Sequence, residues 1–225
     1  MNERNDLALR QELVAAAQRL DAQGLNRGST GNLSVRAPGT PERGFWITPT
    51  GTPAAEMAAD DLVRMGWDGA VQEGPWAPST EWPFHRAVYQ ARPDLQAVVH
   101  LHSPHATALA CLRRELPAFH YMVAVAGGDN VPCTPYHLFG TEALSTAVGA
   151  AFAQRHACLM ANHGLVAGGT HLAHASKVAV ELEALCGIYL QALSVGEPAL
   201  LSPQQMSEVI ERFKTYGRAR RSTSA

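Results

Sequence analysis

Residues 96–102 have the sequence Gln-Ala-Val-Val-His-Leu-His, and their β-branched, apolar character predicts a strand. Alternate side chains of a strand project from the same face, so His100 and His102 lie side by side while Leu101 points the other way. Two imidazoles held in this way form a pair of ligands for one metal ion. The same pattern also occurs as ordinary half-buried histidines, so it indicates a metal site only if further ligands accompany it.

The segments around this strand alternate irregularly between helical and extended patterns. We expect helices at 5–22, from a cap at Ser79 or Thr80 to about Arg92, and at 106–112, 141–154, 171–193 and 203–216. We expect strands at 33–36, 45–48, 62–67, 96–102 and 157–161, and a long loop at 126–140. Several strand pairs look like hairpins, which favours an α/β sandwich with a mixed sheet. We predict a single domain over residues 1–225, with a flexible tail after about residue 217.

The composition argues against several classes of protein. A hydrophobic fraction of 46% and a charged fraction of 17% favour a folded core over disorder. The net charge of −2 argues against binding to nucleic acid or to a membrane surface. The N-terminal segment is too charged for a signal peptide, and no apolar run approaches the ~20 residues of a membrane span. Four widely spaced cysteines without a C-x-x-C pair favour the reducing cytoplasm.

Two further residues are candidates for the missing metal ligands. His163 follows the predicted strand 157–161, and Gly164 after it allows the backbone to turn and expose the imidazole. Three nitrogen ligands with an open position describe a catalytic zinc site. Glu81 lies in the first turn of a predicted helix, where it either stabilises the helix dipole or ligates zinc and transfers a proton. The other histidines are interpreted as surface or core residues.

Three short segments have the composition of a phosphate site: Gly31-Asn32, Thr50-Gly51 and Ser79-Thr80. Glycines allow backbone N–H groups to approach an anion, and the hydroxyl and amide groups add neutral donors. Each segment alone is more often a turn or a helix cap. Gly31 belongs to neither a dinucleotide-binding nor a Walker A pattern, so a nucleotide site is excluded.

Taken in order and spacing, these segments and others resemble the zinc-dependent class II aldolases, in particular the L-fuculose-phosphate aldolases. The resemblance runs nearly end to end. It includes Gly24-Leu25-Asn26, Gly31-Asn32, Ile47-Thr48-Pro49-Thr50-Gly51, Glu81-Trp82, Phe84-His85, Val98-Val99-His100, Phe119-His120-Tyr121-Met122, His163-Gly164-Leu165 and Phe213-Lys214-Thr215-Tyr216-Gly217.

The resemblance implies a three-layer α/β/α sandwich around a mostly antiparallel sheet, assembled as a homotetramer with active sites between subunits. It implies one zinc ion per subunit, bound by His100, His102, His163 and Glu81, with Glu81 also acting as acid and base. The substrate phosphate would be held by Gly31, Asn32, Thr50, Gly51, Ser79 and Thr80. Tyr121 of a neighbouring subunit and Tyr216 would act at the aldehyde end.

The implied reaction is the reversible cleavage of a ketose 1-phosphate, such as L-fuculose 1-phosphate, to dihydroxyacetone phosphate and a small aldehyde such as lactaldehyde. Alternatives with the same fold are aldolases for 5-deoxyribulose or methylthioribulose 1-phosphate, an epimerase, a dehydratase and a decarboxylase. A non-enzymatic scaffold like the head of adducin is a more distant alternative, because a scaffold does not need His100, His102, His163 and Glu81. A metallohydrolase would use three histidines but would not explain the phosphate segments.

Overall fold

The computed structural model describes residues 2–39 and 43–214, and within them an eight-stranded sheet forms the centre of the molecule. The strand order is β4-β3-β2-β1-β5-β8-β7-β6, and every neighbouring pair is antiparallel except β6 and β7. The predicted mixed, mostly antiparallel sheet is therefore confirmed. The strands are β1 (Asn32–Arg36), β2 (Phe45–Ile47), β3 (Val63–Met65), β4 (Val71–Glu73), β5 (Ala97–Leu101), β6 (Cys133–Thr134), β7 (Ala157–Met160) and β8 (Gly164–Gly169).

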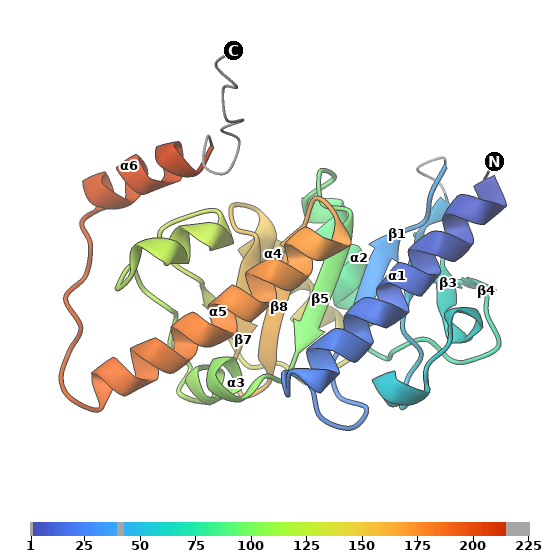
Figure 1. The fold of residues 1–225 in the computed structure, drawn as a ribbon, viewed down its shortest axis with the longest axis horizontal. Helices are drawn as coiled ribbons and strands as arrows, with labels where there is room; N and C mark the ends of the chain where they lie inside the picture. The colour runs from blue at the N-terminus through green and yellow to red at the C-terminus, as the bar shows by residue number, and fades with distance from the viewer. Residues whose placement is uncertain (1, 40–42, 215–225) are drawn as a thin grey trace, which may run out of the picture.

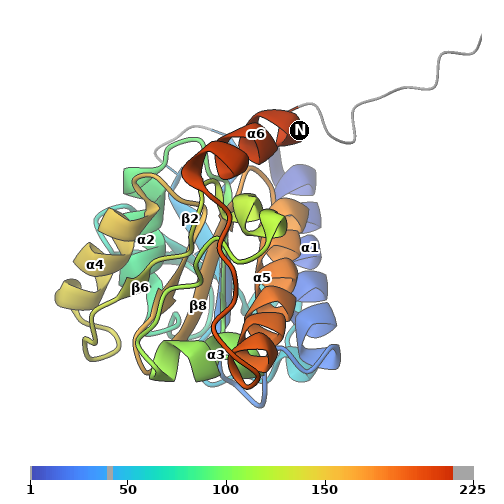
Figure 2. The same cartoon turned by 90° about the vertical axis from the view of Figure 1, so that its left-hand side faces the viewer.

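Helices cover both faces of this sheet (Figures 1 and 2). One face carries α1 (Asn2–Ala22), α3 (Pro104–Cys111) and α5 (Leu172–Leu193), and the other carries α2 (Trp82–Ala91) and α4 (Glu142–Phe152). The last helix, α6 (Pro203–Phe213), packs near the short 3-10 helix η4 (Tyr121–Ala126). Two more short helices, η2 (Ala54–Glu56) and η3 (Ala59–Asp61), contact α1. This arrangement confirms the predicted three-layer α/β/α sandwich.

The side-chain alternation of β5 divides the core into two parts. Ala97, Val99 and Leu101 pack in the larger core beneath α1 and α5, whereas Val98 packs in the smaller core beneath α2 and α4. His100 has the same parity as Val98 and therefore faces the α2 side, where its ring meets Phe84. The sheet thus directs the histidine pair towards the beginning of α2.

Three strands and one cap differ from the sequence-based expectations. The predictions missed β8, whose sequence Gly-Leu-Val-Ala-Gly-Gly is rich in glycine but pairs with both β5 and β7. They also missed β4, which follows the expected strand at 62–67, and the short β6, which lies within the expected loop at 126–140. Glu81, rather than Ser79 or Thr80, occupies the N-cap position of α2, and its side chain makes no capping hydrogen bond.

Several chemical features of the fold bear on function. The capping box of Ser202 and Gln205 is present at the start of α6. The four cysteines are free thiols, and Cys158 and Cys186 are buried. In the described part of the chain, no helix has both the length and the apolar character required to cross a membrane. The expected flexible tail lies outside the described residues.

Candidate active site

The end of β5 and the beginning of β8 lie next to each other in the sheet, and this brings the histidines together. β5 and β8 are antiparallel, and His163 lies in the tight turn that joins β7 to β8. In this turn the His163 N–H donates to the Met160 carbonyl oxygen at 3.0 Å. Gly164 is required by close packing, because a Cβ there would lie 2.4 Å from the Leu101 carbonyl oxygen and 3.2 Å from the His102 ring. The turn therefore leaves space for three imidazoles.

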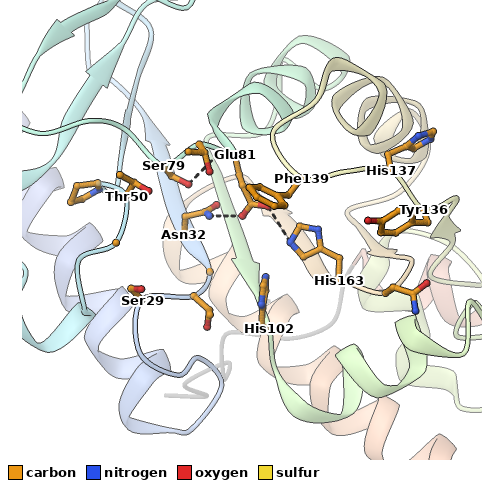
Figure 3. A pocket seen from close by; sticks show the side chains of 16 residues that line it. Ser29, Asn32, Thr50, Ser79, Glu81, His102, Tyr136, His137, Phe139 and His163 are labelled. Carbon is orange, nitrogen blue, oxygen red and sulfur yellow. Dashed lines mark hydrogen bonds and ion pairs between the residues drawn. The ribbon is translucent and has the colours of Figure 1, made fainter.

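Glu81 approaches these imidazoles from the beginning of α2 (Figure 3). Its Oε2 lies 3.2 Å from Nε2 of His100, and its Oε1 lies 3.0 Å from Nε2 of His163. The side chain is buried, and Oε1 has no hydrogen-bond donor. An ionised carboxylate oxygen without a donor is costly to bury, so this atom is chemically suited to a cation.

The ring of His100 presents a lone pair to the same point. Nδ1 of His100 donates to the Leu165 carbonyl oxygen at 2.9 Å, so in the neutral ring Nε2 has a lone pair. That Nε2 lies 3.0 Å from Nε2 of His102. A cation between these atoms would interact favourably with both the His100 lone pair and the Glu81 carboxylate.

The structure brings together the four residues that the sequence analysis proposed as metal ligands. One donor atom from each of Glu81, His100, His102 and His163 lies within 4.8 Å of the others. Three imidazole nitrogens and one carboxylate oxygen form a ligand set that suits zinc or another first-row divalent metal. Among the described residues, no other such cluster of histidine, cysteine and acidic side chains is present.

Two residues of the cluster, Glu81 and His102, have strongly shifted pKa values. Burial by itself raises the pKa of Glu81, but the neighbouring His100 and His163 together hold that pKa well below its usual range. Burial, with smaller contributions from His100 and His163, lowers the pKa of His102 to about 4. At neutral pH the carboxylate is therefore ionised, and the His102 imidazole is neutral.

A cavity of about 320 Å³ opens next to this cluster (Figure 3). Glu81, His102 and His163 line this cavity. All six predicted phosphate residues also line it: Gly31, Asn32, Thr50, Gly51, Ser79 and Thr80. Within the described chain, no lysine or arginine lines this cavity, so the three phosphate segments offer only hydroxyl, amide and backbone N–H donors.

Strand pairing and one bridge bring the three phosphate segments together. Asn32 is paired with His100 across β1 and β5. Pro49 and Pro78 form an isolated bridge, and the Ser79 N–H donates to the Thr48 carbonyl oxygen at 3.1 Å. Gly31 has a φ of +69°, and a Cβ there would lie 2.7 Å from the His100 carbonyl oxygen, so glycine is required at this position.

Comparison with known proteins identifies the family. Residues 11–190 match the model of the family described as Class II Aldolase and Adducin N-terminal domain. The chain belongs to the class II aldolase family. Among its relatives is a Rhodospirillum rubrum protein named 5-methylthioribulose-1-phosphate/5-deoxyribulose-1-phosphate aldolase, which is 47% identical over 94% of this chain and 93% of its own length.

Other relatives support the same assignment. The Escherichia coli L-fuculose phosphate aldolase is 43% identical, over 96% of this chain and 97% of its own. A solved structure of L-fuculose 1-phosphate aldolase superposes with a TM-score of 0.88 and 40% identity, over 92% of this chain and 96% of that one. The chain is thus an enzyme of the aldehyde-lyase class, with a cluster of residues suited to a metal ion.

The cavity of this class II aldolase also contains residues that the sequence analysis did not select. Tyr136, His137 and Phe139 reach it from the segment after β6, and Asn162 reaches it from the turn before β8. These side chains face the cavity because of the path that their loop takes. Hydrophobic periodicity does not predict the path of a loop. The aromatic residues within the glycine- and proline-rich stretch 126–140 were the one feature of the sequence that could have indicated these cavity residues.

The two predicted tyrosines lie away from this cavity or outside the described chain. Tyr121 begins η4 and is 50% exposed, and its ring centroid lies 6.4 Å from that of Phe213. It does not line the cavity of its own chain. Tyr216 lies outside the described residues.

Proposed function

We propose that this class II aldolase depends on zinc and reversibly cleaves a ketose 1-phosphate to dihydroxyacetone phosphate and a small aldehyde. The observation that carries the proposal is the position of Glu81. Its carboxylate lies among histidine nitrogens, and the same cavity is lined by neutral donors suited to a phosphate. A site of this kind combines metal binding, proton transfer and phosphate recognition within one cavity.

The chemical roles follow from the ligand set and its charge. His100, His102, His163 and Glu81 would bind one zinc ion per subunit. The ion would supply Lewis-acid stabilisation of the negative charge that develops as the carbon–carbon bond breaks. In the condensation direction, the Glu81 carboxylate takes a proton from carbon, and in the cleavage direction it returns that proton to the same carbon.

Neutral donors would bind the substrate phosphate. The six proposed residues are Gly31, Asn32, Thr50, Gly51, Ser79 and Thr80. One hydrogen of the Asn32 amide is donated to Oε2 of Glu81 at 2.8 Å, and its second hydrogen remains for a ligand. Asn32 would thus connect the phosphate to the acid–base residue.

We also propose that the chain, as one domain over residues 1–225, assembles as a homotetramer with active sites between subunits. The exposure of Tyr121, and its absence from the cavity of its own chain, support a role in the site of a neighbour. In this proposal Tyr121 and Tyr216 act on the hydroxyl at the aldehyde end. The free cysteines support a location in the cytoplasm.

Two substrate classes are in competition. Similarity to the Escherichia coli relative, named L-fuculose phosphate aldolase, supports L-fuculose 1-phosphate as the substrate. Similarity to the Rhodospirillum rubrum relative supports 5-deoxyribulose and 5-methylthioribulose 1-phosphates, which its name gives. These ketoses differ mainly at the end that leaves as the aldehyde. Tyr136 and Phe139, which are exposed at the cavity, offer an apolar surface that suits a methyl or methylthio group.

A substrate panel tests the proposal. The zinc-loaded enzyme is incubated with each of the three ketose 1-phosphates, and dihydroxyacetone phosphate is measured with a coupled reductase. We expect release from at least one of them, with the highest kcat/KM identifying the aldehyde. Formation of an epimer, a dehydrated ketone or carbon dioxide without dihydroxyacetone phosphate would instead support one of the same-fold alternatives.

A further inference from the structure

A buried ladder of polar side chains runs behind the metal-ligating cluster, between α2 and β1. The helix contributes Glu81, His85 and Tyr89 at intervals of four residues, and the strand contributes Asn32 and Ser34 at an interval of two. Four helical residues rise about 6 Å and two strand residues about 6.6 Å, so the two spacings match along the contact. This match allows each helix residue to meet a strand residue.

The contacts of the ladder are continuous. Asn32 Nδ2 lies 2.8 Å from Glu81 Oε2, and Asn32 Oδ1 lies 2.6 Å from His85 Nε2. His85 Nδ1 lies 2.7 Å from Ser34 Oγ, which lies 2.8 Å from the Tyr89 hydroxyl. All five side chains are buried.

Chemistry determines the direction of every hydrogen bond. The Glu81 carboxylate only accepts, so the Asn32 amide nitrogen faces it and the amide oxygen faces His85. His85 Nε2 therefore carries the hydrogen and donates it. In a neutral ring Nδ1 then accepts from the Ser34 hydroxyl, and the Tyr89 hydroxyl donates to Ser34 Oγ.

The imidazole is held in this neutral form. Burial, together with the neighbouring His100, lowers the pKa of His85 to about 3. The far end of the ladder is anchored among large side chains, because Tyr89 packs against Phe45 and Trp67 and lies beneath the Arg36 guanidinium.

We propose that His85 is a positioning residue for the active site: it holds the Asn32 amide so that its NH₂ group faces Glu81 and the cavity. Without a donor at Nε2, the amide is free to flip and present its oxygen to the carboxylate, which repels it. The inference rests on the proposed metal site, because the carboxylate held in this way is a proposed ligand. Groups that orient ligands in this manner typically contribute ten- to a hundredfold to metal affinity or activity.

A purely structural role is the competing explanation. His85 stacks on Phe84 with ring centroids 4.8 Å apart, so it also fills space in the core. A packing role requires volume and does not require a donor at one particular nitrogen. Variants that retain one or the other nitrogen position therefore separate the two explanations.

The experiment compares His85→Gln with His85→Asn. The glutamine amide reaches the position of Nε2 and preserves the donor to Asn32, whereas the asparagine amide replaces Nδ1 and preserves only the contact with Ser34. Tyr89→Phe is the matched control, since it removes a buried hydrogen bond from the same helix but leaves Asn32 held by His85. Zinc affinity is measured by competition between the holoenzyme and a chromogenic chelator, with kcat, KM and melting temperature recorded for each variant.

We expect His85→Asn to bind zinc about ten- to a hundredfold more weakly than the wild type. His85→Gln and Tyr89→Phe should keep affinities close to the wild type, even where the melting temperature falls. If His85→Asn folds poorly, His85→Phe, which can stack on Phe84, carries the same expectation. Equal zinc affinities for His85→Gln and His85→Asn would overturn the inference alone, whereas a wild-type enzyme that binds no metal would overturn the proposed function with it.

Discussion

Two buried glutamates on opposite faces of the sheet differ in how their oxygens are satisfied. Glu183, on α5, is 6% exposed, and its carboxylate accepts from the His105 N–H, His105 Nδ1 and the Ala106 N–H, each at 2.8 Å. Glu81 is similarly buried, at 8% exposed, yet it has one donor, Asn32, and its Oε1 has none.

The difference distinguishes a structural carboxylate from a reactive one. Glu183 satisfies N–H groups in the first turn of α3, the helix that begins just after His102, and thereby stabilises the helix start. Oε1 of Glu81 accepts no hydrogen bond and lies 3.0 Å from Nε2 of His163. A buried carboxylate oxygen that accepts no hydrogen bond in a folded protein indicates a ligand or a reaction at that point.

Removal of the metal should have the largest effect on activity, because it acts at Glu81 and not at Glu183. Exhaustive chelation should abolish activity, and Zn²⁺ or Co²⁺ should restore it at about one ion per chain, because the charges around Glu81 require a cation. Activity and metal content by atomic emission are measured together. Full activity in protein that contains no metal would show that Glu81 does not act with a metal ion.

Conservative substitution of each glutamate should separate the two roles. Glu81→Gln should lower kcat by about 10²–10⁴-fold, because it removes the acid–base group, while a phosphorylated substrate analogue still binds. Glu183→Gln should leave the chemistry largely intact but lower the free energy of unfolding by about 1–3 kcal/mol, because a donor then faces buried N–H groups. Near-wild-type kcat in Glu81→Gln would make Glu81 a second structural carboxylate.

The open side of Glu81 should be completed by another subunit. Tyr121→Phe and His102→Ala tetramers should each have very low activity, and dissociation and reassembly of the mixture should restore part of it. Some neighbours would then pair an intact metal site with an intact Tyr121. Mixed tetramers confirmed by native mass spectrometry that remain inactive would mean that Tyr121 acts within its own chain or not at all.

Phosphate recognition should depend on the neutral donors next to Glu81. Asn32→Leu or Ser79→Ala should raise KM for the phosphorylated ketose much more than for its non-phosphorylated analogue, because each removes a donor of roughly 1–3 kcal/mol. Steady-state kinetics with both substrates provide the comparison. Equal increases in KM would show that these side chains do not contact phosphate.

The last effect concerns acid sensitivity and disappears at neutral pH. The pKa of His85 is about 3 in the folded protein and 6.5 ordinarily, so between these values the unfolded chain binds more protons. Stability should therefore fall as the pH decreases through this window, by up to about 1.4 kcal/mol per pH unit for this group. Urea unfolding of metal-free protein at several pH values should show a shallower decline for His85→Gln, and parallel declines would contradict the folded pKa.

Local patterns were sufficient to predict much of the fold and part of the site. The first helix, the strand with His100 and His102, and the capping box at Ser202 were predicted from residue spacing alone, because backbone geometry imposes these periodicities. The glycine-rich β8 was missed because its stability comes from pairing with β5 and β7 rather than from its own residues.

The sequence by itself determined which residue types are present and which lie side by side on one strand, as with His100 and His102. It also determined the family, through motifs spread along the chain. Only the tertiary structure decided that Asn32 forms a hydrogen bond with Glu81 across a separation of 49 residues. It also decided that His85, interpreted from sequence as a surface or core residue, forms a hydrogen bond with Asn32. The physical reason is that the periodicity of a helix or strand relates only residues a few positions apart. Hydrogen-bond partners in a site depend instead on how a helix packs on a sheet.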